Sequence, residues 1–264
     1  MYTMNPWLIA APPAIAAAAA GIAAYGAVYP RSQLFGATVS RTNSPRKLAL
    51  TFDDGPNPYV TPKLLDLLDR FNARATFFVI GKHARECPDL LKETFARGHV
   101  IGNHTDAHPN LFWLKPDQIT VELRCCNFSI VAATGAPPRW FRPPFGVRNP
   151  WVIPMARELK QRAVMWTLIP GDWRATSSEW LIPRLAPIAK HAQRSLAATG
   201  ASAATNVGVA TGTGDILCLH DGGHRQLNAD RLPTLAALEY WLPRWRDLGL
   251  EFVTIDAAVS TPAT

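Results

Sequence analysis

The chain has 264 residues, a length typical of one large domain or of one domain with a short extension. Its formal net charge of +7 suits a negatively charged polymer or surface, but no basic run alternates with aromatic residues, so nucleic-acid binding is not expected. The four cysteines show no Cys-x-x-Cys spacing, which argues against a zinc knuckle, and they are too few for a disulfide scaffold.

The amino-terminal segment is apolar and uncharged. No charged side chain precedes Arg31, and residues 7–29 form an alanine-rich stretch that is long enough to span a bilayer. Aromatic residues lie near its ends, at positions typical of interfacial anchors: Trp7, Tyr25 and Tyr29. The pattern predicts an N-terminal hydrophobic helix that anchors the protein in a membrane over residues 1–30.

A cleaved, signal-like segment is the alternative for residues 1–30, although the positively charged start of a signal peptide is missing. Residues 31–46 are predicted to be a linker and residues 47–264 a single folded domain. Residues 195–214 interrupt this domain with small, uncharged residues, which predicts a flexible insertion.

Strands and helices alternate from residue 48 onward. The predicted strands are 48–52, 75–80, 99–102, 140–142, 163–168, 216–219 and 251–255. The predicted helices begin at about residue 61 with Thr61 as the cap, and continue at 83–97, 116–134, 150–160, 177–194 and 232–248. About seven β/α units predict an α/β fold, a TIM-like parallel barrel with helices outside, and an open doubly wound sheet is the alternative. In either fold, chemistry belongs at the carboxyl ends of the strands.

Two adjacent carboxylates, Asp53 and Asp54, end the first predicted strand, and Gly55-Pro56 stops it. Successive side chains of a strand point to opposite faces, so both carboxylates can serve one site only where the backbone bends. Two carboxylates held close together resist ionisation unless a cation lies beside them. The motif therefore predicts a metal ion, an arginine, or both at this strand end.

Two histidines follow the third predicted strand, in the stretch His104-Thr105-Asp106-Ala107-His108. Spaced at i and i+4, they share one face of a helical turn and can bind one metal ion. The glutamate of a helical zinc-protease motif is missing. Together with a carboxylate, two imidazoles leave an open position on zinc, which is typical of a catalytic site.

Three further motifs also follow predicted strands. Arg142 lies in Phe-Arg-Pro-Pro-Phe-Gly and could pair with the carboxylate that is not on the metal. Asp172 lies in Gly-Asp-Trp, and His220 directly follows the apolar run 216–219. Because several polar groups converge on the same face, a general-acid role is favoured for His220 over a structural one.

These residues, in this order, resemble the five motifs of the polysaccharide deacetylases. The matching motifs are Thr51-Phe52-Asp53-Asp54-Gly55-Pro56, His104-Thr105-x-x-His108-Pro109, Arg142-x-Pro144-x-Gly146, Asp172-Trp173 and Leu217-x-Leu219-His220-Asp221. The resemblance covers about residues 46–256 and implies a distorted (β/α) barrel of seven strands. It also implies a metal-dependent hydrolase that removes N-acetyl groups from a carbohydrate, such as a chitooligosaccharide or peptidoglycan, and releases acetate.

The resemblance assigns a role to each motif residue. Asp53 is implied as the catalytic base, and Asp54, His104 and His108 as ligands of a divalent metal, with zinc the expected ion. Arg142 is implied as the partner of Asp53, His220 as the acid, and Asp172 as the residue that tunes His220. Contacts with the substrate or its oxyanion are implied for the remaining motif residues: Phe145 through its backbone N–H, Pro144, Trp173 and Leu219.

Two positions depart from the family pattern, and both concern substrate fit more than the reaction. Ile169 stands where many relatives carry a further Asp, and Cys218 stands where a Leu of the acetyl-methyl pocket is often found. The alternatives left open are a deacylase or deformylase of a lipid-linked sugar and an O-deacetylase of an acetylated polysaccharide. A catalytically inert glycan-binding relative is a further alternative, which the intact motifs argue against.

Two features favour opposite orientations of the predicted anchor. Basic residues after the apolar segment favour a cytoplasmic domain by the positive-inside rule, whereas the usual glycan substrates of the family favour an extracytoplasmic one. We expect a membrane-anchored protein with an extracytoplasmic catalytic domain. Its expected partners are an N-acetylated glycan and, through the N-terminal segment, a membrane.

Overall fold

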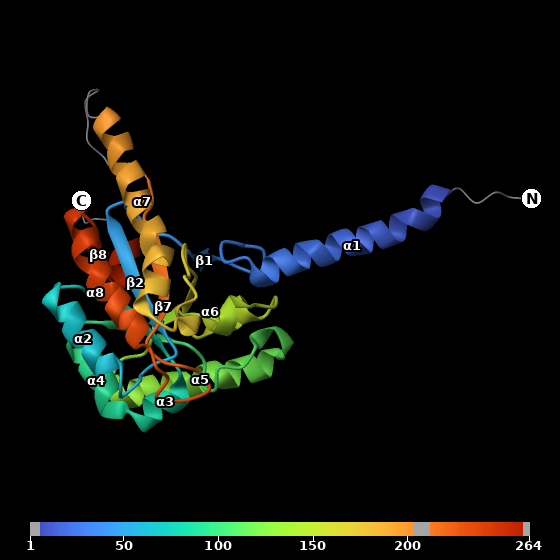
Figure 1. Ribbon diagram of the computed structural model, residues 1–264. Helices are drawn as coiled ribbons and strands as arrows, with labels where there is room; N and C mark the ends of the chain where they lie inside the picture. Colours follow the sequence, from blue (N-terminus) through green and yellow to red (C-terminus); the bar gives the residue numbers. More distant parts are fainter. Residues whose placement is uncertain (1–5, 203–211, 261–264) are drawn as a thin grey trace, which may run out of the picture.

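The computed structural model describes residues 6–202 and 212–260, and helices surround a central sheet (Figure 1). Within these residues the sheet has eight strands, all paired in parallel, in the order β1-β6-β5-β4-β3-β2-β7, with β8 paired to β2. Leu168, which follows β6, forms a parallel bridge with Leu217 of β7. The two ends of the row therefore approach each other, and the α/β sheet curls into a distorted, incomplete barrel.

The strands are short. They are β1 Thr38–Val39, β2 Lys47–Asp53, β3 Thr76–Val79, β4 Val100–Asn103, β5 Trp140–Phe141, β6 Arg162–Val164, β7 Asp215–His220 and β8 Glu251–Val253. The α-helices are α1 Pro6–Val28, α2 Thr61–Arg70, α3 Gly81–Glu86, α4 Pro88–Ala96, α5 Pro116–Thr134, α6 Val152–Glu158, α7 Ser178–Ser202, α8 Leu232–Asp247 and α9 Ile255–Val259. Short 3-10 helices lie in the loops: η1 Leu111–Trp113, η2 Pro144–Gly146 and η3 Asp172–Arg174.

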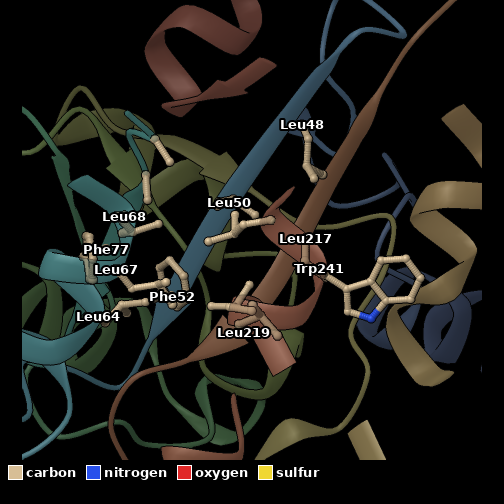
Figure 2. Close-up of a cluster of buried hydrophobic side chains, with 14 of the residues drawn as sticks. Leu48, Leu50, Phe52, Leu64, Leu67, Leu68, Phe77, Leu217, Leu219 and Trp241 are labelled. Carbon is tan, nitrogen blue, oxygen red and sulfur yellow. The ribbon is translucent and has the colours of Figure 1, made fainter. Parts of the chain in front are cut away.

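The side chains of β2 alternate between two faces of the sheet. Leu48, Leu50 and Phe52 point outward and pack in the main core, together with residues of β7, α2 and α8 (Figure 2). Ala49 packs on the inner face in a second buried cluster, so the same alternation places Asp53 inside the barrel. The alternation of side chains along β2 thus places the Asp53 carboxylate at the inner mouth of the barrel.

Several predicted elements differ from the structure. The helix predicted at 83–97 is two helices, α3 and α4, because the backbone leaves the helical region at Cys87 (φ −131°, ψ 56°). The strand predicted at 251–255 ends at Val253, and α9 follows. The linker predicted at 31–46 contains β1, which pairs with β6. Val60, not Thr61, is the N-cap of α2.

The predicted flexible insertion is only partly described. Residues 195–202 continue helix α7, so the prediction of a loop is wrong for this part. Alanine is the strongest helix former, which explains how a run of small residues extends a helix. Residues 203–211 lie outside the described residues.

Helix α1 extends away from the barrel (Figure 1). Among the described residues, no helix is both long enough and apolar enough to cross a bilayer. The predicted membrane anchor at residues 1–30 is therefore not supported.

The carboxyl end of α1 is bound to the barrel by Arg148, which is 1% exposed. Its Nη2 donates to the carbonyl oxygens of Gly26 (3.1 Å) and Tyr29 (2.7 Å), and its backbone N–H donates to the carbonyl of Ala27 (3.0 Å). If the buried guanidinium lost these acceptors, the free energy of removing it from water would no longer be offset by hydrogen bonds. Residues 26–29 thus belong to the fold of the domain.

Deleting residues 1–30 is therefore expected to destabilise the domain, whereas deleting residues 1–20 is not, because only the longer deletion removes the acceptors of Arg148. Leaving this group unsatisfied costs about 1–3 kcal/mol, which corresponds to a fall in Tm of roughly 2–10 °C. Thermal unfolding of both truncations measures the difference. Equal melting temperatures for the two truncated proteins would contradict the account.

Candidate active site

Asp53 lies at the inner mouth of the barrel against a fully buried arginine. Nη1 of Arg142 donates to Asp53 Oδ1 and to Thr51 Oγ1, both at 2.7 Å. Nε and Nη2 of Arg142 donate to the backbone carbonyls of Val164 (3.2 Å) and Met165 (3.3 Å). Arg142 and Asp53 therefore form a buried ion pair, and the guanidinium holds the carboxylate in one orientation.

Asp54 follows the last residue of β2 and turns the chain. Its φ of 70° is in the left-handed region, so its side chain leaves the strand alternation and can reach the same mouth as Asp53. This is the backbone bend that the two adjacent carboxylates require. Gly222 packs against this bend, where a Cβ would come within 2.1 Å of the carbonyl oxygen of Asp54.

His104 and His108 lie beside Asp54. Nε2 of His104 is 3.5 Å and Nε2 of His108 is 3.2 Å from Asp54 Oδ1. The helical turn predicted for these histidines is wrong, because residues 104–108 form a loop and Thr105 and His108 have positive φ values of 66° and 59°. Two left-handed residues, rather than a helix, bring the rings to a centroid distance of 4.9 Å.

The chemistry of these three side chains fits a divalent metal ion. Their ligand atoms lie within 4.8 Å of one another, and Asp54 Oδ1 is buried without a hydrogen-bond partner in the described structure. Nδ1 of His104 donates to the carbonyl of Arg142 at 2.7 Å, which leaves its Nε2 as the free ligand atom. Burial lowers the pKa of His108 to about 3, so this ring is neutral, as a metal ligand must be.

Asp54 is also held in the protonation state that a metal ligand needs, the ionised carboxylate. Burial alone would raise the pKa of its carboxyl, but the His224 side chain and the other nearby histidines hold that pKa well below its usual range.

A second cluster, Asp53, Cys218 and His220, also has ligand atoms within 4.8 Å of one another. It suits a metal less well, because Asp53 is already paired with Arg142, and burial keeps the pKa of the Cys218 thiol well above its ordinary value.

His220 ends β7 and is fixed by Asp172. Nδ1 of His220 donates to Asp172 Oδ1 at 2.9 Å, and the backbone N–H of His220 donates to Asp172 Oδ2 at 2.8 Å. Burial opposes protonation of the ring, but the charge and hydrogen bond of Asp172 outweigh it and raise the pKa of His220 to about 9. A histidine with this pKa carries a proton at neutral pH and can donate it.

A cleft of about 940 Å³ joins these groups. Its lining includes most of the residues predicted for the site: Asp53, Asp54, His104, His108, Phe145, Trp173 and His220. Arg142 and Asp172 are buried behind Asp53 and His220, to which they are hydrogen-bonded. Leu219 and Pro144 do not line the cleft, and Leu219 points into the main core, because the alternation along β7 places Cys218 and His220 inside and Leu219 outside (Figure 2).

Several lining residues were not predicted from the sequence. The ring of His224 stacks on His108 at 4.6 Å, and its Nδ1 is 3.9 Å from Asp54 Oδ2. Trp166 and three arginines also line the cleft: Arg174, Arg225 and Arg231. Single residues in loops carry no spacing pattern, so no sequence signal marks them.

Comparisons with known proteins agree with this site. A profile of the family described as polysaccharide deacetylase matches residues 40–164. A peptidoglycan-N-acetylglucosamine deacetylase of Bacillus cereus is 33% identical over 213 residues, which are 81% of this chain and 88% of that protein. A chitooligosaccharide deacetylase of Bradyrhizobium sp. is 32% identical and covers 78% of this chain and 87% of its own length.

The fold has solved counterparts as well. The structure of a peptidoglycan N-acetylglucosamine deacetylase superimposes with a TM-score of 0.69 and 27% identity, over 85% of this chain and 93% of that one. The sequence similarity and the shared fold lead to one conclusion. This chain belongs to the polysaccharide deacetylase family and is a carbohydrate deacetylase.

Proposed function

We propose that this deacetylase removes N-acetyl groups from a glycan of the peptidoglycan or chitooligosaccharide type. The observation that carries the proposal is the convergence of three units in one cleft: the Asp53–Arg142 pair, the Asp54-His104-His108 cluster and the His220–Asp172 pair. Two relatives that each share about a third of their residues with this chain are named for N-acetylated glycan substrates, which supports the same assignment.

Asp54, His104 and His108 would hold a divalent cation, and zinc is the expected ion because two imidazoles and a carboxylate are ligands of catalytic zinc sites. When bound, such a cation polarises a carbonyl oxygen and lowers the pKa of water. His224 lines the cleft at the edge of the cluster, where its ring stacks on His108.

The side chains around this cluster divide the proton transfers. Asp53, oriented by Arg142, accepts a proton from the water that adds to the amide carbonyl. The backbone N–H of Phe145, a left-handed residue of the cleft wall, stabilises the developing oxyanion. His220 gives its proton to the leaving nitrogen as the C–N bond breaks, and acetate and a free amino sugar are released.

Asp172→Asn should move the alkaline limb of the pH–rate profile to lower pH. Asp172 raises the pKa of His220 to about 9, so an uncharged neighbour lowers that pKa and the acid loses its proton earlier as pH rises. We expect a shift of roughly one unit or more in the limb of kcat/KM. Thr234→Val is the matched control, because it removes a hydrogen bond to Asp172 (3.1 Å) but keeps the charge. An unmoved limb in Asp172→Asn would refute the acid role of His220.

A substrate panel tests the proposed function. Acetate release is measured from chitooligosaccharides, peptidoglycan and acetyl-xylan, each with added zinc, and the products are identified by mass spectrometry. The proposal expects free amines on the first two substrates. Release from acetyl-xylan alone would make the enzyme an O-deacetylase, and release from none would reject a role in glycan deacetylation.

We also propose an extracytoplasmic location for the domain, since peptidoglycan-type substrates lie outside the cytoplasm. A reporter fused to the carboxyl terminus tests this, and activity of a reporter that works only in the cytoplasm would reject it.

A further inference from the structure

The loop that carries the two candidate histidine ligands has an uncommon backbone. Residues 104–108 lie between β4 and η1 and belong to no helix or strand, and Thr105 and His108 are left-handed. Residues with a side chain adopt this conformation only at a cost in free energy, so the surrounding structure must hold the loop in place. The contacts that hold the loop therefore determine where the two imidazoles point.

The two histidines are oriented by different means. Nδ1 of His104 donates to the carbonyl oxygen of Arg142 at 2.7 Å, so a hydrogen bond orients this ring. Nδ1 of His108 is buried and has no hydrogen-bond partner among the described residues. The rings of Phe145 and His224 contact His108, both at a centroid distance of 4.6 Å. Metal-binding histidines usually have a hydrogen-bond partner that fixes the ring, so His108 depends more on its backbone than His104 does.

A carboxylate of α5 binds this backbone directly. Oε2 of Glu122 accepts the N–H groups of Asp106 (3.0 Å) and Ala107 (2.9 Å), the two residues before His108. Hydrogen bonds from backbone N–H groups to a carboxylate are stronger than those to a neutral acceptor. One side chain thus replaces two carbonyl acceptors that a helix or a strand would supply.

Helix α3 binds the carbonyl groups of the same loop. The N–H groups of Gly81 and Lys82 donate to the carbonyl oxygens of Thr105 and Asp106, both at 3.0 Å. Glycine is required at position 81, because a Cβ there would clash with the Asp106 carboxylate. Arg85 binds that carboxylate through two hydrogen bonds, at 2.6 and 3.0 Å. Helix α3 therefore leaves the two N–H groups before the second histidine to α5.

We propose, on the basis of the metal site in the proposed function, that Glu122 is a positioning residue that sets the metal affinity. It fixes the backbone just before His108, whose ring has no hydrogen bond of its own to hold it. Without Glu122, the loop can relax and the ring can turn away from Asp54 Oδ1, which now lies 3.2 Å from its Nε2. Glu122 is not among the described residues that line the cleft, so it acts through the loop.

A purely structural role is the competing explanation for these hydrogen bonds. In that case, losing Glu122 would lower Tm, but the protein that remains folded would bind metal as the wild type does. Metal affinity therefore separates the two explanations. Glutamine keeps an acceptor oxygen at the same reach and should rescue the metal affinity, whereas alanine removes the acceptor.

The test is a calorimetric titration of the metal-free, full-length protein with zinc, and circular dichroism shows that each variant is folded. We expect Glu122→Ala to bind zinc about 10–100-fold more weakly than the wild type, and Glu122→Gln to recover most of this loss. The absorption bands of bound Co²⁺, which depend on coordination geometry, should shift in Glu122→Ala and not in Glu122→Gln. If Glu122→Ala does not fold, Glu122→Asp replaces it with the same expectation, because the shorter side chain cannot reach both N–H groups.

Glu93→Ala is the matched control. It removes a glutamate of another helix, α4, whose ion pair with Arg97 (2.6 Å) lies outside the loop, so its zinc affinity should equal that of the wild type. Equal zinc affinity in folded Glu122→Ala and in the wild type would overturn the inference and leave the metal site intact. An equal loss in Glu93→Ala would overturn it as well. If the wild type binds neither zinc nor Co²⁺, the metal site of the proposed function fails, and the inference fails with it.

Discussion

Replacing Asp53 with asparagine is expected to lower turnover by about 10²–10⁴-fold while metal binding survives. Asp53 would act as the base, and its Oδ1 is bound to Arg142. Asp54→Asn should instead weaken metal affinity, because Asp54 Oδ1 is the atom that both histidines face and an amide is a poorer ligand than a carboxylate. Excess metal should therefore rescue part of the activity of Asp54→Asn and none of that of Asp53→Asn.

The two roles need this test because the carboxylates are close together. Asp53 Oδ2 is 3.9 Å from Nε2 of His104, only slightly farther than the 3.5 Å of Asp54 Oδ1. Calorimetric metal titration of both variants separates them, and their melting temperatures serve as folding controls. If Asp53→Asn lost the metal and Asp54→Asn kept it, the assigned roles would be reversed.

Arg142→Met is expected to destabilise the protein by about 3–5 kcal/mol, because it leaves the buried Asp53 carboxylate without its partner. The carbonyls of Val164 and Met165 lose a donor as well. For a chain of this size the loss corresponds to a fall in Tm of roughly 6–20 °C. Activity should fall too, since the Asp53 carboxylate loses the donor that orients it.

Arg139→Ala is the matched control for Arg142→Met. Arg139 also pairs with an aspartate, Asp256, but its side chain is 74% exposed and the pair is at the surface. Exposed ion pairs contribute little to stability, so its Tm should remain near that of the wild type. Similar falls in Tm in the two variants would show that burial does not determine how much the Arg142–Asp53 pair stabilises the protein.

The motif residues were predictable because their chemistry is local. Adjacent carboxylates at a strand end need a bend and a cation, and the left-handed Asp54 and the Arg142 pair supply both. The two histidines do lie side by side, as expected, but the backbone conformation predicted to bring them together was wrong. Spacing at i and i+4 suggested a helical turn, but the backbone reaches the same result through positive φ angles at Thr105 and His108.

The parts that were not predicted depend on contacts between distant residues. β1 has two residues, too few for a periodic pattern, and is a strand only because β6 offers an unpaired edge. Arg148 contacts residues that precede it by more than a hundred positions. Trp166, His224 and the arginines of the cleft come together only when the barrel is closed, so their role could not be derived from spacing.

Leu219 illustrates a different limit. The motif places it beside the predicted acid, His220, which suggested a contact with the substrate. Alternation along β7 turns it into the main core between the sheet and the helices. A strand motif therefore identifies candidate site residues, but it does not say which face of the sheet each side chain points to. That face follows from the alternation along the strand, starting from a residue known to point inward, such as Asp53.

The measurement that tests the central claim most directly is a zinc titration of the chelated enzyme with acetate release as the readout. Chelated protein is given increasing zinc in the presence of an N-acetylated chitooligosaccharide, and initial rates are recorded for the wild type and for His104→Ala. The account predicts that the wild-type rate rises from near zero to a break at about one equivalent of zinc, while His104→Ala shows no such break. Full acetate release by the chelated wild-type protein would contradict the account.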